Sequence, residues 1–286
     1  MLAAVTRSPG EMVVENVDGP RRARPGHVIV RPEAVGICGS DFHLFSGDLA
    51  ALSGASDFYP RVQGHEVAAI VEDPGDGSET KAGDRVAIWP LLPCGRCYPC
   101  RTGRPNVCPA FRLVGVHLGL AVLAAARHEK ARVMSVDPAK GRRDLAASLG
   151  AEVVTGAAEP EALIAQARDW TAGEGPPLVV ETSGATSVLP TATEIVAPAG
   201  RVVVVGMSSG AVPVRPGIFP EKEIDVLGSS TATAADFRYA ISLVISAREN
   251  ISKLFSHHFP LARAAEAFEF AMSRPPDAVK IVVNVN

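Results

Sequence analysis

The stretch ARVMSVDPAKGRRDLAASLGAEVVTG, residues 131–156, decides the fold class of this chain of 286 residues. An apolar run ends at Asp137, an amphipathic segment RRDLAASLG follows, and a second apolar run AEVV comes next. Apolar strands that alternate with amphipathic helices are typical of parallel strands buried on both faces. The stretch therefore predicts a βαβ unit of an α/β, doubly wound sheet.

The same alternation extends on both sides of this unit. A helical pattern precedes it at 119–130, and two further helix–strand pairs follow, at 161–182 and 187–206. The first part of the chain differs, because runs such as HVIVRPEAVG and EVAAIVED alternate with Gly and Pro and contain hardly any helical pattern. The chain thus divides near residue 118 into an all-β part and a parallel-sheet part.

Composition excludes several functional classes. Hydrophobic residues make up 47% of the chain, charged residues 21%, and the net charge is −3. Such a charge gives no reason to expect nucleic acid or an anionic membrane as a partner. No apolar run approaches the ~20 residues of a membrane helix, and MLAAVTRSPGEMVVENV does not resemble a signal peptide. We expect a cytoplasmic protein.

Four cysteines predict a closed zinc site. They lie in PCGRCYPCRTGRPNVC with the spacing C-x2-C-x2-C-x7-C, at Cys94, Cys97, Cys100 and Cys108. Short steps of this kind let four thiolates surround one tetrahedral ion. Disulfides and a redox pair are the alternatives, and both are disfavoured in a long chain without an export signal.

The fifth cysteine, Cys38 in GICGSDFH, has a possible partner in His65 of GHE. A single cysteine is most often a small buried hydrophobe. Together with the histidine it instead predicts a second metal site, which would be open to a substrate.

These motifs together resemble the zinc-dependent medium-chain alcohol and polyol dehydrogenases. The segments VGVH (114–117), FPEKE (219–223) and GSSTATAADF (228–237) are similar to a sugar-acid branch that includes galactonate and gulonate dehydrogenases. The resemblance implies a GroES-like domain at 1–117, completed by 255–286, and a Rossmann-type NAD-binding domain at 118–254. It also implies that the four-cysteine lobe holds a structural zinc and takes no part in the reaction.

The resemblance assigns roles around the second metal site. Cys38 and His65 match the first two ligands of a catalytic zinc, and Asp41 and Glu66 match acids that orient the ligands or coordinate the metal. The cation would stabilise the ionised alcohol, whose carbon then passes hydride to nicotinamide.

Two further residues match a proton path. Ser40 corresponds to the hydroxyl that takes the alcohol proton, and His43 to the end of a relay to solvent. A surface histidine without a role is the alternative for His43.

The cofactor assignment depends mainly on Asp137. This acid lies 18 residues after Gly119, near the spacing expected for an acid that binds the adenosine ribose hydroxyls, and it favours NAD over NADP. Arg142 matches a residue that covers the adenosine, although a solvated charge at a helix start would look the same. Gly184 and Gly206 fit the cofactor crevice, or are ordinary turn glycines.

One departure from the family pattern is large. Members carry several dozen residues after VGVH, including a third zinc ligand, the first nucleotide-binding strand and its G-x-G-x-x-G loop. Here Leu118 and Gly119 follow His117 directly, and no complete G-x-G-x-x-G exists in the chain. We expect the segment 112–116 to take the place of the missing central strand, with 115–119 as a shortened phosphate turn.

Three interpretations follow. The chain is a zinc- and NAD-dependent dehydrogenase of a small-molecule secondary alcohol, a truncated and catalytically impaired relative that keeps only the structural zinc, or a non-catalytic zinc-binding scaffold. The resemblance also implies that the edge near 211–230 pairs with another subunit, as in family members that form dimers or tetramers.

Overall fold

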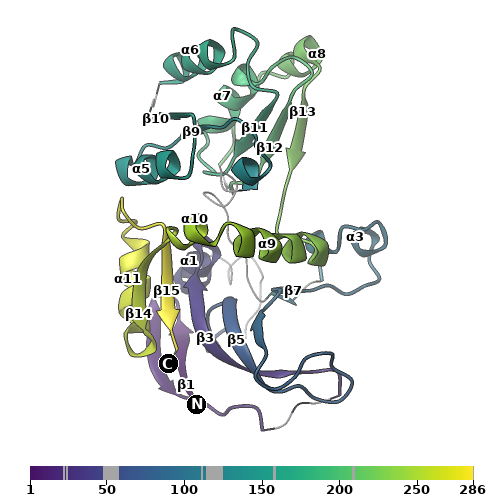
Figure 1. Cartoon of the computed structure of the whole chain (residues 1–286), viewed down its shortest axis with the longest axis vertical. Helices are drawn as coiled ribbons and strands as arrows, with labels where there is room; N and C mark the ends of the chain where they lie inside the picture. Colours follow the sequence, from purple (N-terminus) through teal and green to yellow (C-terminus); the bar gives the residue numbers. More distant parts are fainter. Residues whose placement is uncertain are drawn as a thin grey trace. The chain divides into compact units, whose positions relative to one another are not determined.

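The computed structural model describes residues 1–21, 23, 25–47, 58–110, 112–113, 125–156, 159–207 and 210–285. The chain divides into two compact units, which are described separately (Figure 1). The first unit comprises Met1–His117, Ala232–Tyr239 and Ser252–Asn286, and the second comprises Leu118–Thr231 and Ala240–Ile251. The segment 232–239, which the sequence pattern assigned to the nucleotide-binding part, therefore groups with the β-rich part.

A five-stranded sheet forms the centre of the first unit. Its order is β14-β15-β3-β5-β6, and only β14 and β15 run parallel. The strands are β3 (Ile29–Ile37), β5 (Glu66–Asp73), β6 (Arg85–Ala87), β14 (Phe255–Pro260) and β15 (Lys280–Asn284). Because β15 pairs with β3, the last strand of the chain belongs to the same sheet as the N-terminal strands.

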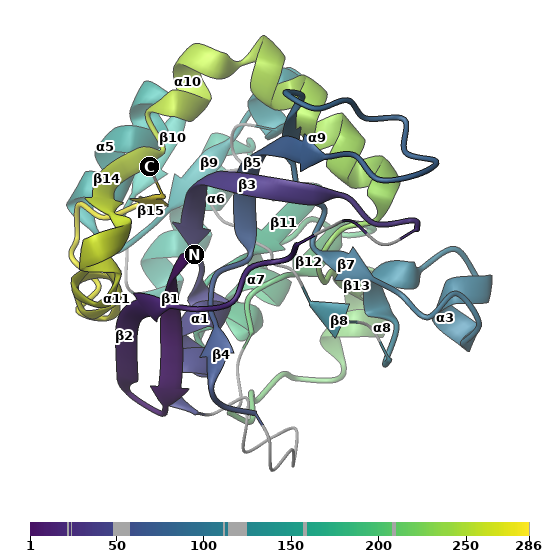
Figure 2. The ribbon, with the colours of Figure 1, turned by 90° about the horizontal axis from the view of Figure 1, so that it is seen from below.

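A smaller sheet lies in the same unit. Strands β1 (Leu2–Ser8) and β2 (Glu11–Asn16) form a hairpin, and β4 (Arg61–Val62) pairs with β1 (Figure 2). Helix α11 (Ala264–Met272) buries Ala264, Ala267, Phe268 and Ala271, which have the i, i+3, i+4, i+7 spacing of one helix face. This face joins Ile37, Phe45 and Ile281 in the hydrophobic core of the unit.

Helix α1 (Gly39–Ser46) was not predicted from the sequence. It has only eight residues, and the two that it buries, Asp41 and Phe45, include a charged one. An apolar periodicity cannot develop over so short a segment. The helix begins directly after Cys38, whose backbone N–H donates to Asp41 Oδ2 at 2.8 Å and so caps the first turn.

The second unit contains the expected parallel strands, and its α/β class is confirmed. The strands are β9 (Met134–Val136), β10 (Val153–Thr155), β11 (Leu178–Glu181), β12 (Arg201–Val204) and β13 (Asp225–Gly228), and all their pairings are parallel. Helices α5 (Lys140–Ser148), α6 (Pro160–Trp170), α7 (Val188–Ile195) and α8 (Ile218–Lys222) connect them. Figure 1 shows β11, β12 and β13 side by side.

The parallel strands form two separate ladders, β10-β9 and β11-β12-β13. In a doubly wound sheet with the order 3-2-1-4-5-6, these ladders correspond to positions 3-2 and 4-5-6. Position 1 is the central strand that the sequence lacks. Within the described part of the chain, no ladder joins β9 to β11.

The prediction that residues 112–116 replace this central strand is wrong for its first two residues. Residues Arg112–Leu113 form β8, which pairs antiparallel with β7 (Leu91–Leu92) in the first unit. The cysteine lobe explains this pairing, because Cys94 follows β7, Cys108 precedes β8, and their contact holds the two strands near each other. The remaining residues of the proposed strand, 114–116, and the turn at 115–119 lie outside the described residues.

The remaining elements are short or peripheral: α3 (Tyr98–Arg101), α9 (Ala234–Ser246), α10 (Arg248–Ser252), and the 3-10 turns η1 (Pro105–Val107) and η2 (Leu261–Arg263). A search of the described helices finds no segment with the length and apolarity needed to cross a bilayer.

The divided sheet predicts uneven protection from amide exchange. Among the described strands, β9 has one hydrogen-bonded neighbour whereas β12 has two. We expect β9 amides to exchange at least about tenfold faster than those of β12, a difference of ~1.4 kcal/mol in opening free energy. Hydrogen exchange followed by NMR measures both. Equal protection would mean that another segment of the chain pairs with β9.

Candidate metal and cofactor sites

The hydroxyl of Ser40 lies between the two residues predicted to bind the catalytic metal. Its Oγ donates to Cys38 Sγ at 3.2 Å and lies 3.1 Å from His65 Nε2. Cys38 and Ser40 flank the start of α1, and His65 precedes β5. The fold therefore brings both potential ligand atoms to one point, as the sequence motifs predicted.

Asp41 orients both of these side chains. The residue is fully buried; its Oδ1 lies 2.8 Å from His65 Nδ1, and its Oδ2 accepts from the backbone N–H of Cys38. The contact with Nδ1 leaves Nε2 directed towards Ser40 and Cys38. Through these contacts Asp41 can orient both side chains.

The electrostatics at this point favour a positive charge. Burial alone would lower the pKa of His65, but its hydrogen bonds with Asp41 and Cys38 outweigh burial and raise the pKa to about 10. A proton on this ring is thus strongly stabilised by the carboxylate and the sulfur. A metal ion bound by Nε2 and the Cys38 thiolate would meet the same negative environment.

Glu66, the other acid predicted near the metal, lies next to a lysine. Its Oε2 forms an ion pair with Nζ of Lys280 on β15, and both side chains are 16% exposed. Burial lowers the pKa of Lys280, and the charge of Glu66 opposes this effect. Sequence analysis missed Lys280, because no local motif links the last strand to residue 66.

The fit of a catalytic zinc to this site is incomplete. Such a zinc ordinarily has three protein ligands and one open position. Cys38 and His65 supply two. Among the described residues, the four lobe cysteines are the only group of three or more possible donors that lie close enough to share an ion.

The four-cysteine lobe fits a structural zinc fully. The ligand atoms of Cys94, Cys97, Cys100 and Cys108 all lie within 4.8 Å of one another. Backbone N–H groups of Arg96 and Cys97 lower the pKa of Cys94 to about 6. A backbone hydrogen bond of Cys100 also lowers the pKa of Cys97, but burial and the neighbouring thiols outweigh it and raise that pKa to about 12. Four thiolates at such distances need a cation between them.

The predicted cofactor residues Asp137 and Arg142 contact each other in the second unit. Asp137 follows β9, and its Oδ2 accepts from Arg142 Nε at 2.8 Å. Its Oδ1 accepts from the backbone N–H of Ala139 at 2.8 Å. The acid is thus held at the carboxyl end of a parallel strand, where a dinucleotide ribose binds in this fold class. Gly119 lies outside the described residues.

The two other predicted glycines meet at the carboxyl ends of β11 and β12. A Cβ atom on Gly206 would overlap the backbone N of Gly184, so this contact requires glycine. Buried Glu181 stabilises the turn, because its Oε1 accepts from the backbone N–H groups of Ser183 and Gly184. Sequence analysis missed Glu181, although an acid at the end of an apolar strand is a recognisable signal.

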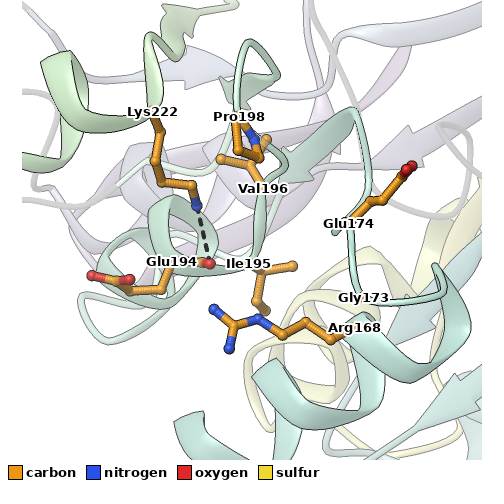
Figure 3. A pocket seen from close by; sticks show the side chains of 8 residues that line it. All are labelled: Arg168, Gly173, Glu174, Glu194, Ile195, Val196, Pro198 and Lys222. Carbon is orange, nitrogen blue, oxygen red and sulfur yellow. Dashed lines mark hydrogen bonds between the residues drawn. The ribbon is translucent and has the colours of Figure 1, made fainter.

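A hollow of about 260 Å³ lies elsewhere in this unit. Figure 3 shows Arg168, Glu194 and Lys222 around it, with Lys222 Nζ bonded to the carbonyl of Glu194. Lys222 also donates to the carbonyl of Thr193, so it caps the end of α7. The hollow adjoins the loops that lead into β11 and β12, at the edge of the sheet opposite Gly184 and Gly206, and we assign it no role.

Comparison with known families gives two matches. Residues 24–137 match the alcohol dehydrogenase GroES-like domain, and residues 118–246 match the domain described as zinc-binding dehydrogenase.

Individual relatives agree with these matches. The chain is 26% identical to a 2-dehydro-3-deoxy-L-galactonate 5-dehydrogenase of Pseudoalteromonas atlantica, with 88% of this chain and 89% of the relative aligned. It is 24% identical to the L-galactonate-5-dehydrogenase of Escherichia coli over 99% and 98% of the two chains. The latter alignment has 345 positions for 286 residues, so the relative carries internal residues that this chain lacks.

Solved structures show the same fold. An alcohol dehydrogenase from Thermus sp. ATN1 aligns with a TM-score of 0.84 at 24% identity and covers 100% of both chains. An alcohol dehydrogenase of Escherichia coli CFT073, solved with NADH, aligns with a TM-score of 0.81 at 22% identity, over 100% of this chain and 99% of that one.

Loss of the Asp41 carboxylate should weaken metal binding without removing a ligand. For Asp41→Asn we expect about 10- to 100-fold weaker binding at the Cys38–His65 site, because the imidazole loses its orienting partner. Competition titration with a zinc chelator measures the dissociation constant. Asp144→Asn, an exposed acid of α5, is the matched control and should leave it unchanged.

Loss of one lobe thiol should affect the zinc of the four-cysteine lobe and leave the Cys38–His65 site unchanged. We expect Cys97→Ser to lose one tightly bound zinc and to become more sensitive to proteolysis within 93–108, because three thiols hold the loop less firmly. Zinc analysis and limited proteolysis measure these effects. Cys38→Ser should retain the lobe zinc, and loss of that zinc in Cys38→Ser would contradict the separation of the two sites.

Proposed function

The chain belongs to the zinc-dependent medium-chain alcohol dehydrogenase family, and we propose that it oxidises a secondary alcohol of a polyol or sugar acid with NAD⁺. The observation that carries this proposal is the convergence of Cys38 Sγ and His65 Nε2 on the hydroxyl of Ser40. A zinc bound there would supply the positive charge that makes an alcohol hydroxyl acidic near neutral pH.

Other residues near this site would orient the metal ligands and transfer the proton of the alcohol. Asp41 holds the imidazole and the cysteine backbone in place. Ser40 Oγ, which already lies between the two ligand atoms, is placed to take the proton of the alcohol. His43 lies one helical turn further along α1 and is exposed, as a group that passes the proton to solvent must be.

The cofactor assignment has support from both the site and the comparisons. Asp137 presents a carboxylate at the end of β9, which can accept hydrogen bonds from ribose hydroxyls and repels a 2′-phosphate. Arg142, Gly184 and Gly206 complete the proposed cofactor residues. A protein of the same fold was solved with NADH.

The substrate class follows from the relatives. The two galactonate dehydrogenases act on sugar acids, and the sugar-acid branch predicted from the sequence is confirmed at this level. Other relatives of comparable identity are L-threonine 3-dehydrogenases, such as that of Pyrococcus horikoshii, at 27%. A hydroxyl-rich sugar acid is therefore the first substrate to test.

The proposal also assigns a role to each unit, a location to the protein and an edge at which two subunits pair. The β-rich unit is the catalytic domain, the parallel-sheet unit binds NAD, and the protein is cytoplasmic. All four residues of the edge strand β13 are exposed, Val226 and Leu227 among them, which supports pairing with a second copy at this edge.

One observation favours a second candidate, the catalytically impaired relative. Within the described residues no strand joins the two parallel ladders, and the sequence contains neither the third ligand nor the glycine-rich turn that accompany the central strand in the family. Both losses weaken binding, one of metal and the other of pyrophosphate.

Three measurements on the purified chain decide between the candidates. If the chain is an active dehydrogenase, it should bind a second zinc equivalent when zinc is added. It should also bind NAD⁺ in calorimetry and form NADH from L-galactonate or a related sugar acid. Cys38→Ala should abolish turnover and keep the lobe zinc. One zinc per chain with no NADH formation would reject the proposed activity and support the impaired relative.

Cofactor choice provides a separate prediction. We expect Asp137→Ala to weaken NAD⁺ binding at least about tenfold, because a charged hydrogen bond to the ribose contributes roughly 1.5–3 kcal/mol. The same change should narrow the preference for NAD⁺ over NADP⁺, since the repulsion of the 2′-phosphate is lost. Calorimetry with both cofactors tests this, with Asp144→Ala as control. An unchanged NAD⁺ affinity would exclude Asp137 from the cofactor site.

A further inference from the structure

Arg143 on α5 contacts the carboxyl ends of β9 and β10, where the proposed cofactor acid is held. Helix α5 lies beside these two strands (Figure 1). The Nη1 atom of Arg143 donates to the backbone carbonyl of Asp137 at 2.8 Å and to that of Pro138 at 2.7 Å. Because the strands are parallel, Asp137 and Gly156 follow strand ends at the same edge of the ladder. One guanidinium nitrogen thus joins α5 to the turn that carries Asp137.

The guanidinium occupies space that Gly156 leaves open. A Cβ atom at position 156 would lie 2.6 Å from Arg143 Nη1 and 2.9 Å from its Cζ, closer than real Cβ atoms approach other atoms. The backbone of Gly156 has no positive φ, so its conformation does not require glycine. The missing side chain at this position instead makes room for the arginine.

The turn between β9 and α5 is held differently by its two arginines. Ala139, at the N-cap of α5, makes no side-chain cap hydrogen bond, and its backbone N–H donates to Asp137 Oδ1. Arg142 donates to Oδ2 of the same carboxylate. Arg143 instead contacts the backbone carbonyls, so it holds the turn without using the carboxylate oxygens that a ribose would need.

We propose that Arg143 is a positioning residue that fixes the turn carrying Asp137, and that Gly156 provides the space for its guanidinium. The inference deepens the proposed function and rests on it for the identity of the ligand, NAD⁺. Arg143 acts through Asp137 and does not contact the cofactor. An acid that is ordered before the cofactor arrives loses less conformational freedom on binding, and this raises affinity.

Amide exchange in the full chain, followed by NMR, tests the positioning role without any cofactor. In Arg143→Met we expect the Ala139 amide to exchange about tenfold faster, because the turn opens more often once its carbonyl contacts are lost. Amides of β12 should keep their native rates, which distinguishes this local effect from a loss of global stability. Lys140→Met removes an exposed charge from the same helix and should leave Ala139 unchanged. Native exchange of Ala139 in Arg143→Met would overturn the proposal.

Gly156→Ala displaces the guanidinium without removing its charge. The displaced atoms lie at the far end of a flexible side chain, so this variant should fold even if Arg143→Met does not. We expect Ala139 to exchange faster than in the native chain, as in Arg143→Met. When Arg143 is already methionine, Gly156→Ala should add less than about a twofold change, because the two residues act through one contact. An equally large effect of Gly156→Ala without Arg143 would reject the role assigned to the glycine.

Calorimetry with NAD⁺ tests whether this positioning matters for the cofactor. We expect Arg143→Met and Gly156→Ala each to weaken NAD⁺ binding about fivefold, since the acid must then be ordered on binding. In an Asp137→Ala background, loss of Arg143 should change the affinity by less than about twofold. A further loss there would mean that Arg143 contacts the cofactor itself, and would overturn the proposal. If the native chain binds no NAD⁺, the proposed function fails, and the exchange of Ala139 still decides the positioning role.

Discussion

The buried carboxylate of Asp41 is the contact on which the candidate active site depends. It accepts from the backbone of Cys38 and contacts the imidazole of His65, so it joins the start of α1 to the segment before β5. A fully buried acid is costly unless both of its oxygens have partners. Here the partners are the two predicted metal ligands, and the requirement to satisfy Asp41 also fixes their orientation.

Negative charge is concentrated at both potential metal sites and is balanced differently at each. The lobe has four thiols within reach of one ion and needs a cation to hold them together. At the second site, Asp41 raises the pKa of His65, and Lys280 neutralises Glu66. The two acids beside Cys38 and His65 thus each contact a basic group of the chain itself.

The parallel sheet shows the consequence of the missing segment most directly. Two ladders that should flank a central strand are not joined within the described residues. Arg112 and Leu113, the first residues of the segment expected to replace the central strand, instead pair with β7, because the cysteine lobe holds them there. The chain thus keeps both fold types of the family, and in the described residues the strands of the parallel-sheet unit form two separate ladders.

Much of this could be predicted from the sequence alone: the two fold types, the zinc lobe, the proximity of Cys38 to His65, and the break between the two parallel ladders of the described residues. Each leaves a local pattern, either periodic apolar residues or closely spaced ligands. Helix α1, the Lys280–Glu66 pair, the pairing of β8 and the turn held by Glu181 were decided only by tertiary structure. They depend on contacts between distant segments, or on a helix too short for a periodic signal, and one sequence contains no record of which distant strand will lie alongside another.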